Sequence, residues 1–174
     1  NPISNEYTSE NNIIDIKGLR DETSQNIISL FEEASKLNLI LGLEPIGSWE
    51  ILKKGHFNSI ASCLKLVKDN NHKLIIDLYH SFTDADLDTF LRKSPNLGLL
   101  QFSNISFDKN LRPIGRKTIN DLNNQNNLDL SKYIKYIFNR KDKIKIEFEV
   151  FASDVNEDPK EIILNLKSEI LKLL

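Results

Sequence analysis

The chain has 174 residues, 40% of them hydrophobic and 28% charged, with a formal net charge of -2 and a sequence pI near 6.0. This length and composition suffice for the core of one domain or of part of a larger one, and the dispersed Lys and Arg residues exclude the basic face of a nucleic-acid-binding protein. No apolar run reaches the roughly 18 residues of a membrane-spanning helix and no signal-peptide pattern is present, so we expect a cytoplasmic protein with no membrane partner.

Helical and strand-like apolar patterns alternate along the chain. In chain order, the sequence predicts a helix over 20–37, a strand over 37–45, a helix over 58–68, a strand over 73–80, a helix over 87–93, a strand over 97–103, a helix over 128–138, a strand over 145–151 and a last helix that begins at Asp158. Each strand is nearly continuous in apolar residues, which is typical of a parallel sheet covered by helices. The predicted fold class is therefore α/β, and we interpret the polar first 18 residues as loop or a strand remnant.

Two connections are long enough to carry functional side chains. Trp49 follows the first strand, where it would either stack on a ligand or pack into the protein. A loop rich in Asn follows the third strand and carries Arg112, Gly115 and Arg116. We predict that it is a surface loop, with a lid over a site as the alternative.

Three residues of reactive type are expected to have ordinary structural roles. Cys63 lies among apolar residues at helical spacing, which favours a buried small side chain over a reactive thiol. His56 and His72 lie in polar stretches, one before a helix and one before a strand. We expect both histidines on the surface rather than in a ligand set.

Polar side chains occur at the end of each predicted strand. Because side chains alternate along a strand and ligands bind at the carboxyl ends of parallel strands, we expect four of these side chains to face one site: Glu44, Asp77, Gln101 and Glu149. Three carboxylates cannot share a small space while ionised unless a cation or protons neutralise them. An all-oxygen set favours Mg²⁺ or Mn²⁺, and His80 would point at whatever the metal holds. Ordinary helix capping or loop ion pairing is the alternative for each carboxylate.

The order of these segments resembles a known family. LGLEP, FNSIASCLKLV, LIIDLYH, LGLLQFSN, LDLSKYI and IEFEVF follow one another as in the xylose isomerase-like TIM barrels of the sugar phosphate isomerase/epimerase superfamily. The resemblance covers about residues 21–153, and its most specific part is the Asp-x-x-His of Asp77 and His80.

This resemblance implies a (β/α)8 barrel of which the four strands form the second half. Residues 1–174 are then a single domain or the C-terminal half of one barrel, and the chain, which contains no methionine, would lack a front part. The first half would lie outside this sequence or come from a partner chain, and a homo-oligomer is one such arrangement because an open half-barrel exposes two sheet edges.

The resemblance also implies roles for individual residues. One divalent metal would be held by Glu44, Asp77, Gln101 and Glu149. We expect this metal to be Mn²⁺ or Mg²⁺. Glu44 and Glu149 would in addition be the catalytic carboxylates, while His80 and Arg112 would bind the substrate. Gln101 departs from the His of many members, although a branch similar to hydroxypyruvate isomerase has Gln there.

These residues favour a metal-dependent isomerase or epimerase of a small sugar, polyol or keto-acid, working by proton transfer through an enediolate. A dehydratase of the inosose or dehydroshikimate type starts with the same proton abstraction and stays open as an alternative. An endonuclease IV-like enzyme is disfavoured because it needs a histidine-rich three-zinc site and the chain has three His. A non-catalytic barrel fragment that acts as a binding module is the remaining alternative.

Overall fold

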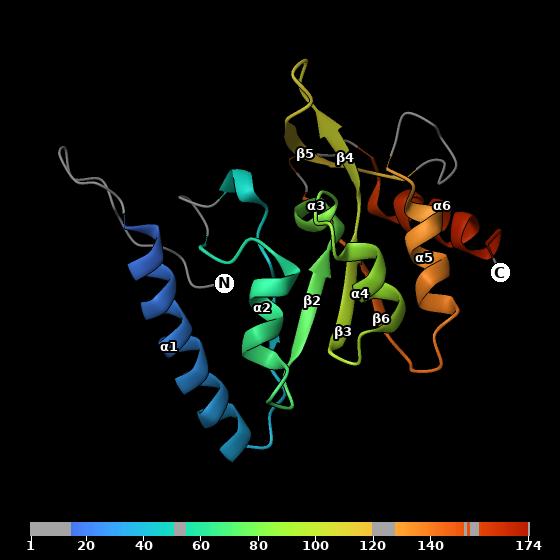
Figure 1. Ribbon diagram of the computed structural model, residues 1–174. Coiled ribbons are helices and arrows are strands. Elements are labelled where there is room, and N and C mark those ends of the chain that lie inside the picture. Colours follow the sequence, from blue (N-terminus) through green and yellow to red (C-terminus); the bar gives the residue numbers. More distant parts are fainter. Residues whose placement is uncertain (1–14, 51–54, 120–127, 152, 154–156, 174) are drawn as a thin grey trace.

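A computed structural model describes residues 15–50, 55–119, 128–151, 153 and 157–173 (Figure 1). The prediction for the first 14 residues and that for the Asn-rich segment 120–127 lie outside the described residues. The elements in chain order are α1 (Ile16–Lys36), β1 (Gly42–Leu43), the 3-10 turn η1 (Ser48–Glu50), α2 (Ile60–Val67), β2 (Lys73–Asp77), α3 (Leu78–Ser81), α4 (Leu87–Lys93), β3 (Leu97–Phe102), β4 (Asn104–Phe107), β5 (Pro113–Lys117), α5 (Leu130–Phe138), β6 (Lys145–Phe148) and α6 (Pro159–Leu171).

The predicted strands form one four-stranded parallel sheet in the order β1-β2-β3-β6. Neighbours in the sheet are joined by helical crossovers, as in a segment of a (β/α) barrel. The register aligns Asp77 with Gln101 and Gln101 with Glu147, so these three side chains lie on the same face of the sheet. The predicted α/β class and the parallel sheet are confirmed.

Helices α2, α4 and α5 cover one face of this sheet (Figure 1), and the core lies between them and the strands. The fully buried side chains of this layer include Ile60, Cys63, Leu74, Ile76, Leu91, Leu100 and Ile134. The other face is more open: Ile75 and Leu99 are only half-buried, and Lys145 and Glu147 are exposed. Within the described part of the chain, no helix is both long and apolar enough to span a membrane.

Part of the stretch predicted as a loop forms an antiparallel hairpin of β4 and β5, which projects beyond the carboxyl ends of the main sheet (Figure 1). The Asp108 side chain closes its turn by accepting hydrogen bonds from the backbone N–H groups of Asn110 at 2.8 Å and Arg112 at 2.9 Å. The turn is held by a backbone hydrogen bond between Asp108 and Arg112 as well as by this side chain, and its polar residues resemble those of an irregular loop. The loop prediction was therefore wrong for residues 104–117.

Two histidines predicted on the surface are buried, with exposed fractions of 4% for His56 and 1% for His72. Nδ1 of His72 accepts the N–H of Leu41 at 3.0 Å, and its ring lies 4.1 Å from that of Phe31. These partners are 31 and 41 residues away in sequence, so the polar neighbours of His72 in the chain carried no information about them. Cys63 is fully buried, as predicted.

Candidate functional site

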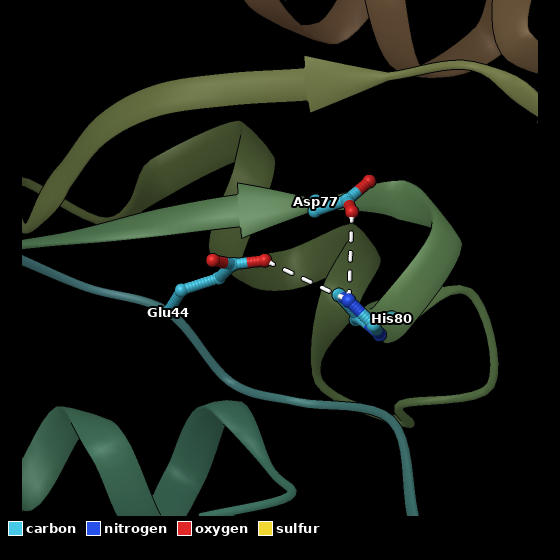
Figure 2. A group of neighbouring side chains, drawn as sticks. All are labelled: Glu44, Asp77 and His80. Atoms are coloured by element: carbon cyan, nitrogen blue, oxygen red, sulfur yellow. Dashed lines mark ion pairs between the residues drawn. The ribbon is translucent and has the colours of Figure 1, made fainter. Parts of the chain in front are cut away.

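The carboxyl end of β2 carries the most buried acidic side chain of the site. Asp77 is the last residue of β2, and its Oδ1 accepts the N–H of Tyr79 at 2.9 Å, so that it caps the short helix α3. The strand predicted through residue 80 therefore ends at Asp77. The turn into α3 brings His80 back toward the strand, with Nε2 lying 3.9 Å from Asp77 Oδ2 (Figure 2).

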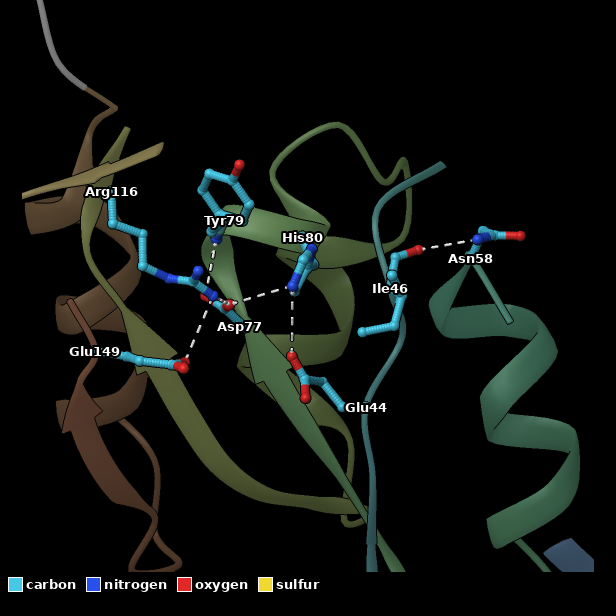
Figure 3. Close-up of polar contacts among 8 residues, drawn as sticks. All are labelled: Glu44, Ile46, Asn58, Asp77, Tyr79, His80, Arg116 and Glu149. Carbon is cyan, nitrogen blue, oxygen red and sulfur yellow. Dashed lines mark hydrogen bonds and ion pairs between the residues drawn. The ribbon is translucent and has the colours of Figure 1, made fainter. Parts of the chain in front are cut away.

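Glu44 approaches the same point from the end of β1. The segment after it is tied to the start of α2, because Ile46 donates its N–H to the carbonyl of Phe57 at 2.9 Å and receives a hydrogen bond from the Asn58 amide at 3.1 Å (Figure 3). Glu44 Oε1 lies 3.9 Å from Nε2 of His80. One ligand atom from each of Glu44, Asp77 and His80 thus lies within 4.8 Å of the others (Figure 2).

Glu149 and Arg116 complete the cluster from the opposite side (Figure 3). Glu149 follows β6 and donates its N–H to the carbonyl of Phe102 at 3.1 Å, which continues the ladder between β3 and β6 by one residue. Nη2 of Arg116 makes a short contact with Asp77 Oδ2 and lies 3.5 Å from Glu149 Oε2. The Arg116 side chain is 5% exposed, and its guanidinium lies 4.4 Å from the centre of the Tyr79 ring.

The other predicted site residues are placed less closely. Gln101 lies beside Asp77 in register on the neighbouring strand and on the same face of the sheet. Arg112, predicted to bind substrate, lies near the turn of the β4–β5 hairpin, where its 72% exposed side chain pairs with Asp108 at 3.1 Å. The structure does not bring Arg112 to the cluster, and its role in substrate binding stays a prediction.

Arg116 is the site residue that sequence reasoning did not assign. The available signal was the alternation along β5: Arg116 pairs in register with the buried Ile105 and is itself buried, whereas Lys117 beside it is exposed. This signal is readable only once residues 104–117 are known to form a hairpin.

The cluster carries more negative than positive charge. Burial, together with the neighbouring carboxylates of Asp77 and Glu149, raises the pKa of Glu44 from 4.5 to about 7. Burial also raises the pKa of Asp77, an effect opposed by the guanidinium of Arg116. One guanidinium only partly offsets the charge of three ionised carboxylates, so the donor set of this site fits a divalent cation.

The protein resembles known proteins in its fold but not significantly in its sequence. No family model matches the sequence, and no curated protein sequence matches it significantly. Among solved structures, a D-psicose 3-epimerase in the presence of D-fructose is similar, with a TM-score of 0.63 at 14% identity, and the match covers 95% of this chain and 58% of that chain. The apo form of 3-keto-D-glucoside 4-epimerase YcjR from E. coli gives 0.64 at 16% identity, with 95% and 57% covered.

A third similar structure, protein SMc04130 from Sinorhizobium meliloti 1021, has a TM-score of 0.67 at 15% identity, with 94% of this chain and 60% of that chain covered. The class of protein is thus a parallel α/β barrel fold. More specifically, the fold is similar to that of solved structures described as xylose isomerase domain or xylose isomerase-like TIM barrel proteins. The chain spans less than two thirds of the length of the three structures above. The predicted resemblance and fold class are confirmed, whereas the assignment of residues 1–174 as a single domain or as the C-terminal half of a barrel stays a prediction.

Proposed function

We propose that the chain is part of a divalent-metal-dependent isomerase or epimerase acting on a small sugar, polyol or keto-acid. The observation that carries this proposal is the convergence of Glu44, Asp77 and His80 within 4.8 Å at the carboxyl ends of parallel strands. The similar structures described as sugar epimerases support the substrate class. Fold similarity alone would not support it, because one barrel fold hosts many reactions.

The residues proposed to hold the metal are Glu44, Asp77, Gln101 and Glu149. Oxygen donors of this kind favour Mn²⁺ or Mg²⁺. Such a cation, when bound, would act as a Lewis acid toward substrate oxygens and stabilise the negative charge that develops on them. Nε2 of His80 lies 3.9 Å from both Glu44 and Asp77, close enough to serve as a further ligand, and on the family resemblance we propose that it instead contacts the substrate held at the metal.

The proposed catalytic pair is Glu44 and Glu149. They come from the two outer strands of the sheet, with Asp77 on an inner strand between them (Figure 3), so they approach a substrate held at Asp77 from opposite sides. One carboxylate would remove a proton from the carbon beside a carbonyl, and the other would return one.

The test of this proposal is the metal content of the purified protein, measured by elemental mass spectrometry after Mn²⁺ or Mg²⁺ has been supplied and unbound ions removed. We expect near-stoichiometric metal in the wild type and its loss in Asp77→Ala and Glu149→Ala. Glu147→Ala is the matched control, because Glu147 lies on the same strand end but is exposed, and it should retain metal.

A wild-type protein without metal after this treatment would refute the proposal, and so would equal metal loss in Glu147→Ala. If the wild type and its variants show the expected metal contents, incubation with ketoses, polyols and keto-acids distinguishes isomerisation or epimerisation from dehydration. These reactions share proton abstraction as their first step. An isomer or epimer of equal mass supports the proposed function, whereas loss of water identifies a dehydratase.

A further inference from the structure

Arg116 reaches the carboxylate cluster from outside the main sheet. It extends from β5 of the hairpin and is buried between Asp77 and Glu149 (Figure 3). Of the two Asp77 oxygens, Oδ1 accepts the N–H of Tyr79, so Oδ2 is the oxygen that faces the site. Nη2 of Arg116 contacts this same Oδ2.

The guanidinium of Arg116 occupies the position that a bound cation would take. Nη2 lies against Asp77 Oδ2 and 3.5 Å from Glu149 Oε2, which is the place that an ion bridging these two carboxylates would need. Two cations cannot occupy this place together, because each needs the same carboxylate oxygens and the two positive charges repel. An ion bound only by Glu44, Asp77 and His80 would still share Oδ2 with Arg116.

We propose that Arg116 is a built-in counter-ion that competes with the divalent cation for Asp77 and Glu149 and leaves them when the cation binds. This inference rests on the proposed function, since it concerns the same site. Arg116 is thus a positioning residue that keeps the carboxylates together in the cation-free protein and sets how tightly a cation is held.

The aromatic surroundings allow this displacement. The guanidinium lies 4.4 Å from the centre of the Tyr79 ring and 4.8 Å from that of Phe151. A planar guanidinium keeps favourable contact with aromatic faces while its hydrogen-bond partners change. Once released from Asp77, its N–H groups would be available to oxygen atoms of a bound substrate.

A purely orienting role predicts the opposite effect on affinity. Removing a residue that only orients a ligand weakens metal binding by roughly 10- to 100-fold. Removing a competitor strengthens binding, although the cation-free protein becomes less stable because its carboxylates then repel without compensation. The sign of the change in affinity therefore distinguishes the two roles.

The experiment is isothermal titration of Mn²⁺ at pH 8 into wild type, Arg116→Ala, Arg116→Lys and Lys117→Ala. We expect Arg116→Ala to bind Mn²⁺ at least about tenfold more tightly than the wild type, and Arg116→Lys, which keeps the charge, to bind within about threefold of it. Lys117→Ala removes the same charge from the next, exposed residue of β5 and should leave the affinity unchanged. Thermal denaturation in EDTA should show a lower Tm for Arg116→Ala, and added Mn²⁺ should raise that Tm more than it raises the wild-type Tm.

Each outcome is decisive. If the wild type binds Mn²⁺ and Arg116→Ala binds equally or more weakly, the counter-ion inference is overturned while the proposed function stands. Binding by Arg116→Ala but not by the wild type would overturn both, because the guanidinium would then stay on the carboxylates and exclude the cation. Binding by neither protein would overturn both.

Discussion

Glu44 is the residue whose ionisation should affect stability most directly. In the cation-free protein its pKa rises from 4.5 to about 7 because the side chain is largely buried beside Asp77 and Glu149. A raised carboxyl pKa means that the ionised form opposes folding: the penalty is absent below about pH 4.5, grows between pH 4.5 and 7, and is complete above pH 7. Removing the charge should therefore stabilise the protein only at the higher pH values.

We expect Glu44→Gln to increase the free energy of unfolding in EDTA by up to about 3 kcal/mol at pH 8 and by almost nothing at pH 4.5. Urea denaturation at pH 4.5, 6 and 8 measures this difference. Glu147→Gln is the control, because Glu147 is exposed and should give the same small change at all three values. A stability difference for Glu44→Gln that does not vary with pH would contradict the expected charge repulsion.

Cys63 provides a second prediction for a single residue. Burial raises the pKa of its thiol to about 12, so almost no thiolate exists at neutral pH and reagents cannot reach the sulfur. We expect Ellman's reagent at pH 8 to leave the native protein unlabelled and to label one thiol per chain in guanidinium chloride. Rapid labelling of the native protein would show that Cys63 is accessible.

The acidic residues of the site were predictable one at a time. Glu44, Asp77 and Glu149 follow or end apolar strands, and strands in a parallel sheet bring such positions to one edge. Arg116 was not predictable in this way, because its position depends on the pairing of β4 with β5 and on contacts with residues 39 and 33 positions away, Asp77 and Glu149. Sequence periodicity reports the local environment of a residue and not its distant ion pairs.

At the scale of elements, His72 connects α1 to the segment before β1. Since Nδ1 accepts the N–H of Leu41, the neutral ring carries its proton on Nε2 and donates it to the carbonyl of Phe31 at 3.0 Å. We expect His72→Ala to lower the free energy of unfolding by about 2 to 4 kcal/mol, because both backbone groups lose a buried partner.

Urea denaturation of His72→Ala beside Asn71→Ala tests this connection. Asn71 is the preceding residue and is exposed, so its replacement should change stability by less than about 0.5 kcal/mol. A similar small loss for both variants would show that the contacts of His72 with α1 contribute little to stability.

The helices and strands themselves were largely predictable because their apolar periodicity is strong. The residues at which these helices and strands end were less predictable. Strand β1 contains only Gly42 and Leu43, although the apolar run is longer, and β2 ends at Asp77 because its side chain caps α3. At β2 a polar side chain that bonds to a nearby backbone group thus decided where the strand ends, and the hydrophobic pattern does not record such a bond.

At the scale of the whole molecule, the site depends on elements from most of the sheet. Glu44 follows β1, Asp77 ends β2, His80 lies on α3, and Glu149 follows β6, while β5 supplies the guanidinium (Figure 3). The sequence indicates the alternation of elements, and the parallel arrangement of the strands brings their carboxyl ends to one edge of the sheet. The share of the barrel that the chain represents also came from comparison with solved structures and not from periodicity.

This convergence makes a prediction about where a bound cation stabilises the chain. A cation that is held by several strand ends should slow backbone hydrogen exchange at all of them together, because opening any one end would break its coordination. We expect 5 mM Mg²⁺, compared with EDTA, to slow exchange about tenfold in residues 43–50, 77–82 and 147–151, measured by mass spectrometry at pH 7.5. Residues 130–138 of α5, which pack on the outer face, should be unaffected.

Asp77→Ala is the control for this measurement, since it removes the most buried carboxylate of the cluster. It should abolish the effect of Mg²⁺ in all three segments, because a cation bridging the strand ends cannot be held by one end alone. Protection confined to one segment would mean that the carboxylates act separately, as ordinary strand-end caps. Uniform protection throughout the chain would indicate general ionic stabilisation of the protein, which would equally contradict a single shared site.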